Sequence, residues 1–381
     1  MPAHSRRDHP SPDHLHRSHL HRDHPTPNSN SNHFSPNHFS PNHPNPNHPD
    51  SNYPNHPNSH HFSHKHPNHP VPNQELHQGY CFNPQCRQSV DPEFLWECPH
   101  CHMPLLIGDR YRPLHLLRHN QGQYATDLLE VEDWVNGGPT QVMKVLSHRC
   151  SLTQASLAQE AVHLMWLDHH HIPKVQADGY FVAKVPYSAV PLCCLVMEPK
   201  AGQPLDQWLA LHRPSIDQVL QWLSQLLDLL RHVHAVGLVH GDLKPANLLL
   251  QPGGQLALLD FGASVRIGRQ QLGRTSSFGY AAPEQVCGEA LGGATDAFAL
   301  GRTVVHMLTG QHPLDLLDDT GQDVVWRSHA PTIWPALAAW VDQLMAPDPG
   351  DRPDLATPNP LLATPRAKPT TPAEIRPLQG I

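Results

Sequence analysis

The chain has 381 residues, a formal net charge of −8 at pH 7 and 16% charged residues. Residues 1–79 are charge-balanced, so the negative charge falls on residues 80–381, which argues against a nucleic-acid-binding surface. No run approaches the ~18 apolar residues of a membrane-spanning helix, and the first residues lack a signal peptide's apolar core; both features predict a cytoplasmic protein.

Residues 1–79 form a low-complexity segment in which eighteen of the chain's 34 histidines alternate with Pro, Asn and Ser. Such a segment buries too little apolar surface to offset its ordering entropy, so we expect it to be disordered. Its imidazoles could bind Zn²⁺, Ni²⁺ or Cu²⁺ weakly, or respond to pH. The simpler interpretation is a neutral repeat expansion or a start codon assigned too early.

Four cysteines gather in the next segment, residues 80–107, at positions Cys81, Cys86, Cys98 and Cys101. Two short cysteine pairs at this separation can present four thiolates tetrahedrally to Zn²⁺, and a metal would explain how so short a segment folds. The alternatives are a disulfide pair, which a cytoplasmic setting disfavours, redox-sensing thiols or unpaired cysteines. The other cysteines, at 150, 193, 194 and 287, are expected to be interior residues.

The region 110–195 reads as mostly β, with one long helix. It contains a strand-like run, Val142-Met143-Lys144-Val145, and sixteen residues after Lys144 comes Glu160, in an apolar pattern with helical spacing. A Lys144–Glu160 ion pair would orient the lysine. A second helix is predicted from Ser215 to about His234, because its apolar residues recur at helical spacing and Ser215 with Gln218 forms a capping-box pattern.

The most informative stretch runs from Val239 to Asn247 and reads V-H-G-D-L-K-P-A-N; eighteen residues after Asp242 comes Asp260, in D-F-G. Asp242 is the candidate to accept a proton from a hydroxyl nucleophile, and Lys244 can neutralise charge on a transferring phosphoryl group. Asn247 and Asp260 offer the oxygen ligands that Mg²⁺ prefers. This set could hold a nucleoside triphosphate with Mg²⁺ and aim a hydroxyl at its terminal phosphorus.

These motifs resemble the H-R-D-L-x-x-x-N and D-F-G loops of protein kinases. Further along, Ala282-Pro283-Glu284 resembles A-P-E, Asp296 resembles the buried aspartate of the family's central helix, and Arg352 resembles the arginine that pairs with the A-P-E glutamate. The four cysteines followed by Arg110-Tyr111-Arg112 resemble the start of cyanobacterial-type serine/threonine kinases.

The resemblance implies an α+β, bilobal kinase fold over residues 110–355, preceded by a zinc-ribbon-like module and followed by a disordered Pro/Thr-rich tail at 356–381. It implies transfer of the γ-phosphate of ATP to protein serine or threonine, with Lys244 marking that specificity. The residues that it implies for nucleotide binding are Lys144, Glu160, Asp260, Gly122 and, at the hinge, Met197, Glu198 and Lys200.

The pattern departs from the family at two places. Leu117–Tyr124, where G-x-G-x-x-G belongs, holds only Gly122, so backbone N–H groups should approach phosphates less closely. This departure motivates an alternative, a pseudokinase scaffold with weak nucleotide binding. Gly241 stands where many family members have an arginine that pairs with a phosphorylated activation segment, so we predict that switching does not depend on phosphate at Thr275, Ser276 or Ser277.

Overall fold

The computed structural model describes residues 77–83, 85–91, 96–120, 126–146, 151–184, 191–271, 277–321, 323–330 and 333–357. Residues 1–76 of the histidine-rich segment, nearly all of the C-terminal tail, Gly122, Cys150, Thr275 and Ser276 lie outside the described residues. Within the described residues, no helix combines the length and the apolar character needed to cross a membrane.

The four-cysteine segment forms a small hairpin of β1 (Gly79–Tyr80) and β2 (Ser89–Val90), paired antiparallel. Its own core consists of Cys81, Val90, Cys98 and Leu105. Phe82 instead joins the buried cluster beneath the neighbouring sheet, which also contains Met143 and Val145. The hairpin therefore shares apolar packing with the next part of the chain.

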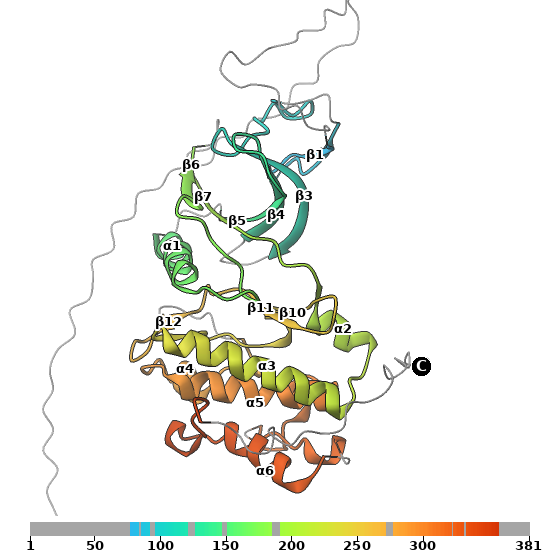
Figure 1. The fold of residues 1–381 in the computed structure, drawn as a ribbon, viewed down its shortest axis with the longest axis vertical. Coiled ribbons are helices and arrows are strands. Elements are labelled where there is room, and N and C mark those ends of the chain that lie inside the picture. The colour runs from blue at the N-terminus through green and yellow to red at the C-terminus, as the bar shows by residue number, and fades with distance from the viewer. Residues whose placement is uncertain are drawn as a thin grey trace, which may run out of the picture. The chain divides into compact units, whose positions relative to one another are not determined.

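That next part is a five-stranded antiparallel sheet with the order β3-β4-β5-β7-β6 (Figure 1). The strands are β3 (Tyr111–Asn120), β4 (Thr126–Asp133), β5 (Gln141–Leu146), β6 (Tyr180–Ala183) and β7 (Leu192–Met197). In β4 the buried residues alternate, at Leu129, Val131 and Asp133, as expected of a strand with one covered face. The first half of the predicted glycine loop, residues 117–120, is strand β3, and residues 121–124 lie outside the described residues.

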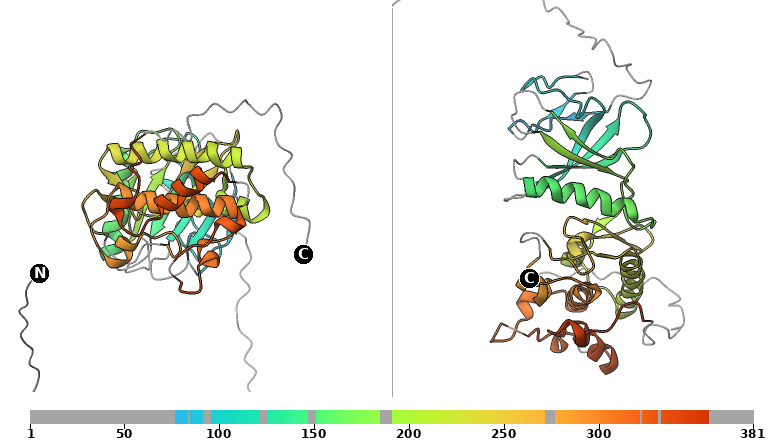
Figure 2. Two further views of the ribbon diagram at one scale, coloured as in Figure 1. Left: turned by 90° about the horizontal axis from the view of Figure 1, so that it is seen from below. Right: turned by 90° about the vertical axis from the view of Figure 1, so that its left-hand side faces the viewer.

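Helix α1 (Ser151–Trp166) lies against this sheet, in contact with β5 and β7 (Figure 2). Leu157, Ala161, Leu164 and Leu167 face the core, and Glu160 is buried among them. The predicted helix around Glu160 is therefore present, and its apolar stripe aims the carboxylate toward β5.

The larger part of the chain is helical, with α2 (Leu205–Leu211), α3 (Ile216–Ala235), α4 (Pro283–Cys287), α5 (Gly293–Thr309) and α6 (Pro335–Leu344). Helices α3 and α5 contact each other and share one core (Figure 1). The predicted stripe of α3 is buried, and each fully buried leucine contributes about 1.5–3 kcal/mol. Ser215 caps α3 by accepting from the Gln218 N–H, whereas the Gln218 side chain bonds Gln221 instead of completing the capping box.

Short elements in this helical part position the polar residues discussed below. They are β8 (Gln203–Pro204), β9 (Leu238–Val239), β10 (Leu248–Leu250), β11 (Leu256–Leu258) and β12 (Val265–Arg266), with 3₁₀ turns η1 (Pro245–Asn247), η2 (Pro313–Leu316), η3 (Arg327–His329) and η4 (Pro349–Asp351). Strand β9 leads into residues 240–247, and β11 leads into Asp260. One expectation was wrong: Cys287 is exposed, because it lies on the short surface helix α4, while Cys193 and Cys194 are buried in β7.

Candidate active site

A buried aspartate fixes the backbone of the 240–247 loop. Asp296 lies in the first turn of α5, and its carboxylate accepts from the N–H groups of His240 (2.8 Å) and Gly241 (2.9 Å) and from His234 Nε2 (2.8 Å). Burial by itself would raise the pKa of Asp296, but these hydrogen bonds outweigh it and hold that pKa below its usual value. The loop is therefore tied to the helical core by an ionised side chain.

The loop brings Asp242, Lys244 and Asn247 together. Lys244 Nζ lies 2.6 Å from Asp242 Oδ2 and 2.5 Å from Ser277 Oγ. Asn247 Nδ2 donates to the carbonyl of Asp242 (2.8 Å) and to its Oδ2 (2.9 Å), which leaves the Asn247 amide oxygen as the group able to ligate a metal. Oδ1 of Asp242 is buried and has no hydrogen-bond partner among the described residues, so it can accept a proton from an incoming hydroxyl.

Asp260 lies beside this loop, because the Leu259 N–H donates to the carbonyl of Asn247 at 2.9 Å. Its backbone has φ +58°, a left-handed conformation that is uncommon for non-glycine residues. Lys144 Nζ contacts Asp260 Oδ1 at 2.8 Å and Glu160 at 2.8 and 3.0 Å. The predicted Lys144–Glu160 pair thus forms, and it includes the D-F-G aspartate.

The charges in this trio stabilise one another. Lys144 holds the pKa of Asp260 well below its usual range. Burial favours neutral Lys144, but the carboxylates of Asp260 and Glu160 outweigh it and raise the lysine's pKa. For Glu160 burial dominates and raises the pKa despite the lysine. The Lys144 ammonium is therefore held between the carboxyl groups of Glu160, which is buried, and Asp260, which is accessible.

The predicted hinge follows β7. Met197 is the last residue of that strand and pairs with Val142 of β5. The Glu198 N–H donates to the carbonyl of Lys174, and Lys200 Nζ binds the carbonyl of His170 (2.8 Å) and Glu198 (3.0 Å). The side chains of both residues are therefore engaged with each other, and their roles toward adenine stay predictions.

The A-P-E glutamate and Arg352 form the predicted pair. Two hydrogen bonds of 2.7 and 2.9 Å join the Arg352 guanidinium to Glu284, and both side chains are buried. Burial would raise the pKa of Glu284, but the bonds from Arg352 and Thr295 lower it. This pair ties α4 to the segment after α6.

Two glutamines that the sequence analysis did not single out connect the loop to the residues after D-F-G. Gln285 Nε2 donates to the carbonyl of Gly241 (2.8 Å), and Gln271 Nε2 donates to the carbonyl of Ala263 (2.9 Å). The two side chains also contact each other at 3.3 Å. Uncharged amides therefore connect the segment after D-F-G to the 240–247 loop.

The four cysteine sulfurs lie within 4.8 Å of one another. Cys81 and Cys101 are 3.5 Å apart, and Cys86 and Cys98 are 3.8 Å apart, far longer than a disulfide bond of about 2.05 Å. Four thiolates at about 2.3 Å from Zn²⁺ lie roughly 3.8 Å from one another, so the spacing fits a tetrahedral metal. Burial opposes ionisation of Cys101, but hydrogen bonds from Met103 and Asn83 outweigh it and lower its pKa to about 7.

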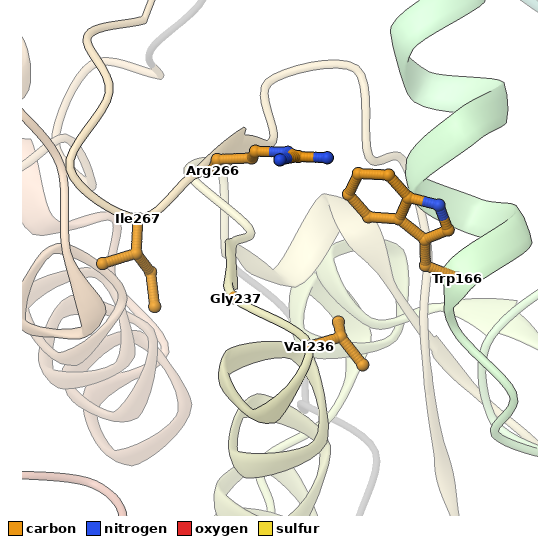
Figure 3. Close-up of a pocket in the computed structure, with 5 residues that line it drawn as sticks. All are labelled: Trp166, Val236, Gly237, Arg266 and Ile267. Carbon is orange, nitrogen blue, oxygen red and sulfur yellow. The ribbon is translucent and has the colours of Figure 1, made fainter.

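Two cavities lie away from this polar cluster. One, of about 450 Å³, is lined by Trp166, Val236, Gly237, Arg266 and Ile267, with the Arg266 guanidinium over the Trp166 ring (Figure 3). The other, of about 410 Å³, is lined in part by Met197 and Glu198. Neither is lined by Asp242, Lys244 or Asp260.

Comparison with known proteins gives matches across this region. Residues 136–355 match the protein kinase domain. Serine/threonine-protein kinase F of Synechocystis sp. is 33% identical over 283 residues, covering 70% of this chain and 56% of that protein. Kinase D of the same organism is 35% identical over 150 residues (36% and 29%), and the probable kinase PknB of Lactococcus lactis is 28% identical over 218 residues (55% and 33%). The chain thus spans at most 56% of the length of these relatives.

Proposed function

This chain belongs to the protein kinase family, and on that premise we propose that it transfers the γ-phosphate of ATP to serine or threonine hydroxyls of proteins. The observation that carries the proposal is the carboxylate of Asp242: Lys244 and Asn247 both contact its Oδ2, and its Oδ1 is buried and has no hydrogen-bond partner among the described residues. A carboxylate fixed through one oxygen by a cation and an amide can use its other oxygen to orient a hydroxyl and accept its proton.

Each side chain has one role in this proposal. Asp242 orients the hydroxyl and accepts its proton, while Lys244 neutralises charge on the phosphoryl group and contacts Ser277 beside the substrate. Lys144, positioned by Glu160, holds the nucleotide's phosphates. The named relatives are serine/threonine kinases, which supports the choice of acceptor.

The oxygen atoms present also fit Mg²⁺. Asp260 offers an ionised, accessible carboxylate, and Asn247 offers an amide oxygen whose nitrogen is already committed to Asp242. When bound, Mg²⁺ neutralises charge on the phosphates. These two residues hold it in the proposal.

Transfer from γ-labelled ATP to a Ser/Thr peptide library tests this function. We expect incorporation that requires Mg²⁺ and is lost in Asp260→Asn. Asp228→Asn is the matched control, because Asp228 is an exposed carboxylate on α3 that pairs only with Arg231 among the described residues. MgATP binding without any transfer by the wild type would instead identify a scaffold, and label on tyrosine alone would overturn the proposed acceptor.

A second proposal follows from the cysteines: Cys81, Cys86, Cys98 and Cys101 bind a structural Zn²⁺. Their spacing and the small size of the hairpin's own core support it. We expect about one zinc per chain by elemental analysis, and loss of that zinc with a lower melting temperature in Cys98→Ser. Cys287→Ser, at an exposed cysteine, should change neither. A purified chain without zinc and with unchanged stability under a chelator would exclude the site.

A further inference from the structure

Arg87 links the four-cysteine hairpin to the sheet of the kinase domain. It follows Cys86 directly, with φ +50°, and its N–H donates to the carbonyl of Asn83. Its guanidinium lies 3.4 Å from both carboxylate oxygens of Asp127 and 3.2 Å from His119 Nδ1. Its side chain is 28% exposed, so the contact is partly shielded from water.

His119 and Asp127 are opposite each other on β3 and β4, close to the end of that hairpin. His119 Nδ1 lies 2.6 Å from Asp127 Oδ1, which requires a proton on Nδ1 that is donated to the carboxylate. A protonated Nδ1 cannot accept from Arg87, so the guanidinium donates to Asp127 instead. Asp127 is therefore the centre of a clamp, with one donor from the opposite strand and one from the cysteine hairpin.

The clamp lies next to a strand position that supports the proposed nucleotide site. Asp127 precedes Leu128, which pairs directly with Lys144 on β5. Strand β4 thus connects the clamp to the lysine proposed to hold the phosphates. In addition, β3 is the edge strand of this sheet, and its pairing with β4 contains two register shifts.

We propose that Arg87 is a positioning residue for the phosphates of ATP: by clamping Asp127, it fixes strand β4 and, through the pairing of β4 with β5, the position of Lys144. This inference rests on the proposed nucleotide site. It gives the cysteine hairpin a role in substrate binding beyond stability.

The hairpin should keep its fold without Arg87, because other contacts hold it. Phe82 lies in the core of the sheet, Arg112 donates to the carbonyl of His77, and Trp96 contacts Trp134 edge-on at 5.6 Å. Arg87→Ala therefore isolates the clamp from the fold of the module.

The experiment measures the affinity of full-length wild type and Arg87→Ala for MgATP and for adenosine, by calorimetry. A charge-assisted contact that is partly exposed predicts a roughly 3- to 10-fold weaker MgATP affinity. Adenosine, which lacks phosphates, should bind within about twofold of wild type, and zinc content should not change. Arg327→Ala is the matched control, since it removes an Arg–Asp pair from the helical lobe.

Several outcomes would overturn the inference: unchanged MgATP affinity, equal weakening of both ligands, or no MgATP binding by the wild type. If Arg87→Ala loses zinc, Asp127→Asn tests the same contact by removing its partner on β4. The double variant should bind MgATP no more weakly than either single variant. Additive losses would refute the clamp. A wild type that binds MgATP but transfers no phosphate would refute the proposed function and leave this inference standing.

Discussion

Replacing Gly241 by alanine should disturb the active-site loop more than its size suggests. Gly241 has φ +76°, and an added Cβ would lie 2.8 Å from the carbonyl oxygen of Ala263. The left-handed conformation costs a non-glycine residue about 1–2 kcal/mol, and relief of the contact adds to that. We expect the free energy of unfolding to fall by roughly 2–3 kcal/mol. Because Asp242 is the next residue, kcat should fall at least about tenfold.

Gly237 provides the control. It has φ +79°, but an added Cβ would meet nothing within 4 Å. Gly237→Ala should therefore show only the conformational cost, about 1 kcal/mol, with kcat nearly unchanged. Urea denaturation and steady-state kinetics of both variants give the comparison. Equal destabilisation of the two, with wild-type kcat in Gly241→Ala, would refute the reasoning.

The same geometry bears on regulation. The arginine that many family members carry at the position of Gly241 would meet the same strain and the same carbonyl. In its place, Gln285 of α4 donates to the Gly241 carbonyl and to Gln271, which in turn donates to the carbonyl of Ala263, and neither glutamine is charged. A connection made by neutral amides needs no phosphate to form.

Three further predictions follow. Thr275→Ala with Ser276→Ala should keep activity within about threefold, and a large loss would show that phosphate is needed after all. Arg352→Ala should lower the free energy of unfolding by about 3–5 kcal/mol in a denaturant titration, since it leaves the Glu284 carboxylate buried without its cation; a loss under 1 kcal/mol would contradict this. Burial lowers the pKa of His163 to about 4 in the folded chain, against about 6.5 in the unfolded chain. Above pH 6.5 the histidine is neutral in both states and the folded chain keeps its full stability. As the pH falls from 6.5 toward 4, the unfolded chain takes up a proton first, so the free energy of unfolding falls by up to about 3 kcal/mol. His163→Gln should flatten the pH dependence of unfolding in that window, and identical slopes would contradict the assignment.

The sequence predicted the parts of the site whose geometry is local. Asp242, Lys244 and Asn247 lie within six positions, and the buried stripe of α3 follows from its spacing alone. The Lys144–Glu160 pair was predictable because Lys144 lies in a predicted strand and Glu160, of opposite charge, lies in the predicted helix that follows it.

The sequence did not predict contacts that depend on tertiary packing between polar residues. Arg87 and Asp127 are 40 positions apart and belong to no motif, so only the docking of the cysteine hairpin on β3 and β4 brings them together. Gln285 likewise reaches Gly241 because α4 packs beside the loop. The exposure of Cys287 escaped prediction because an apolar neighbourhood in sequence does not decide which face a short helix buries.

The most direct test of the account compares phosphoryl transfer by wild type and Asp242→Asn. The amide keeps the shape of the side chain but cannot take the hydroxyl proton, so kcat should fall by about 10²–10⁴. MgATP affinity should stay within about threefold, because Lys144 and Asp260 are untouched. A variant that transfers phosphate at the wild-type rate would contradict the assignment of Asp242 and the mechanism built on it.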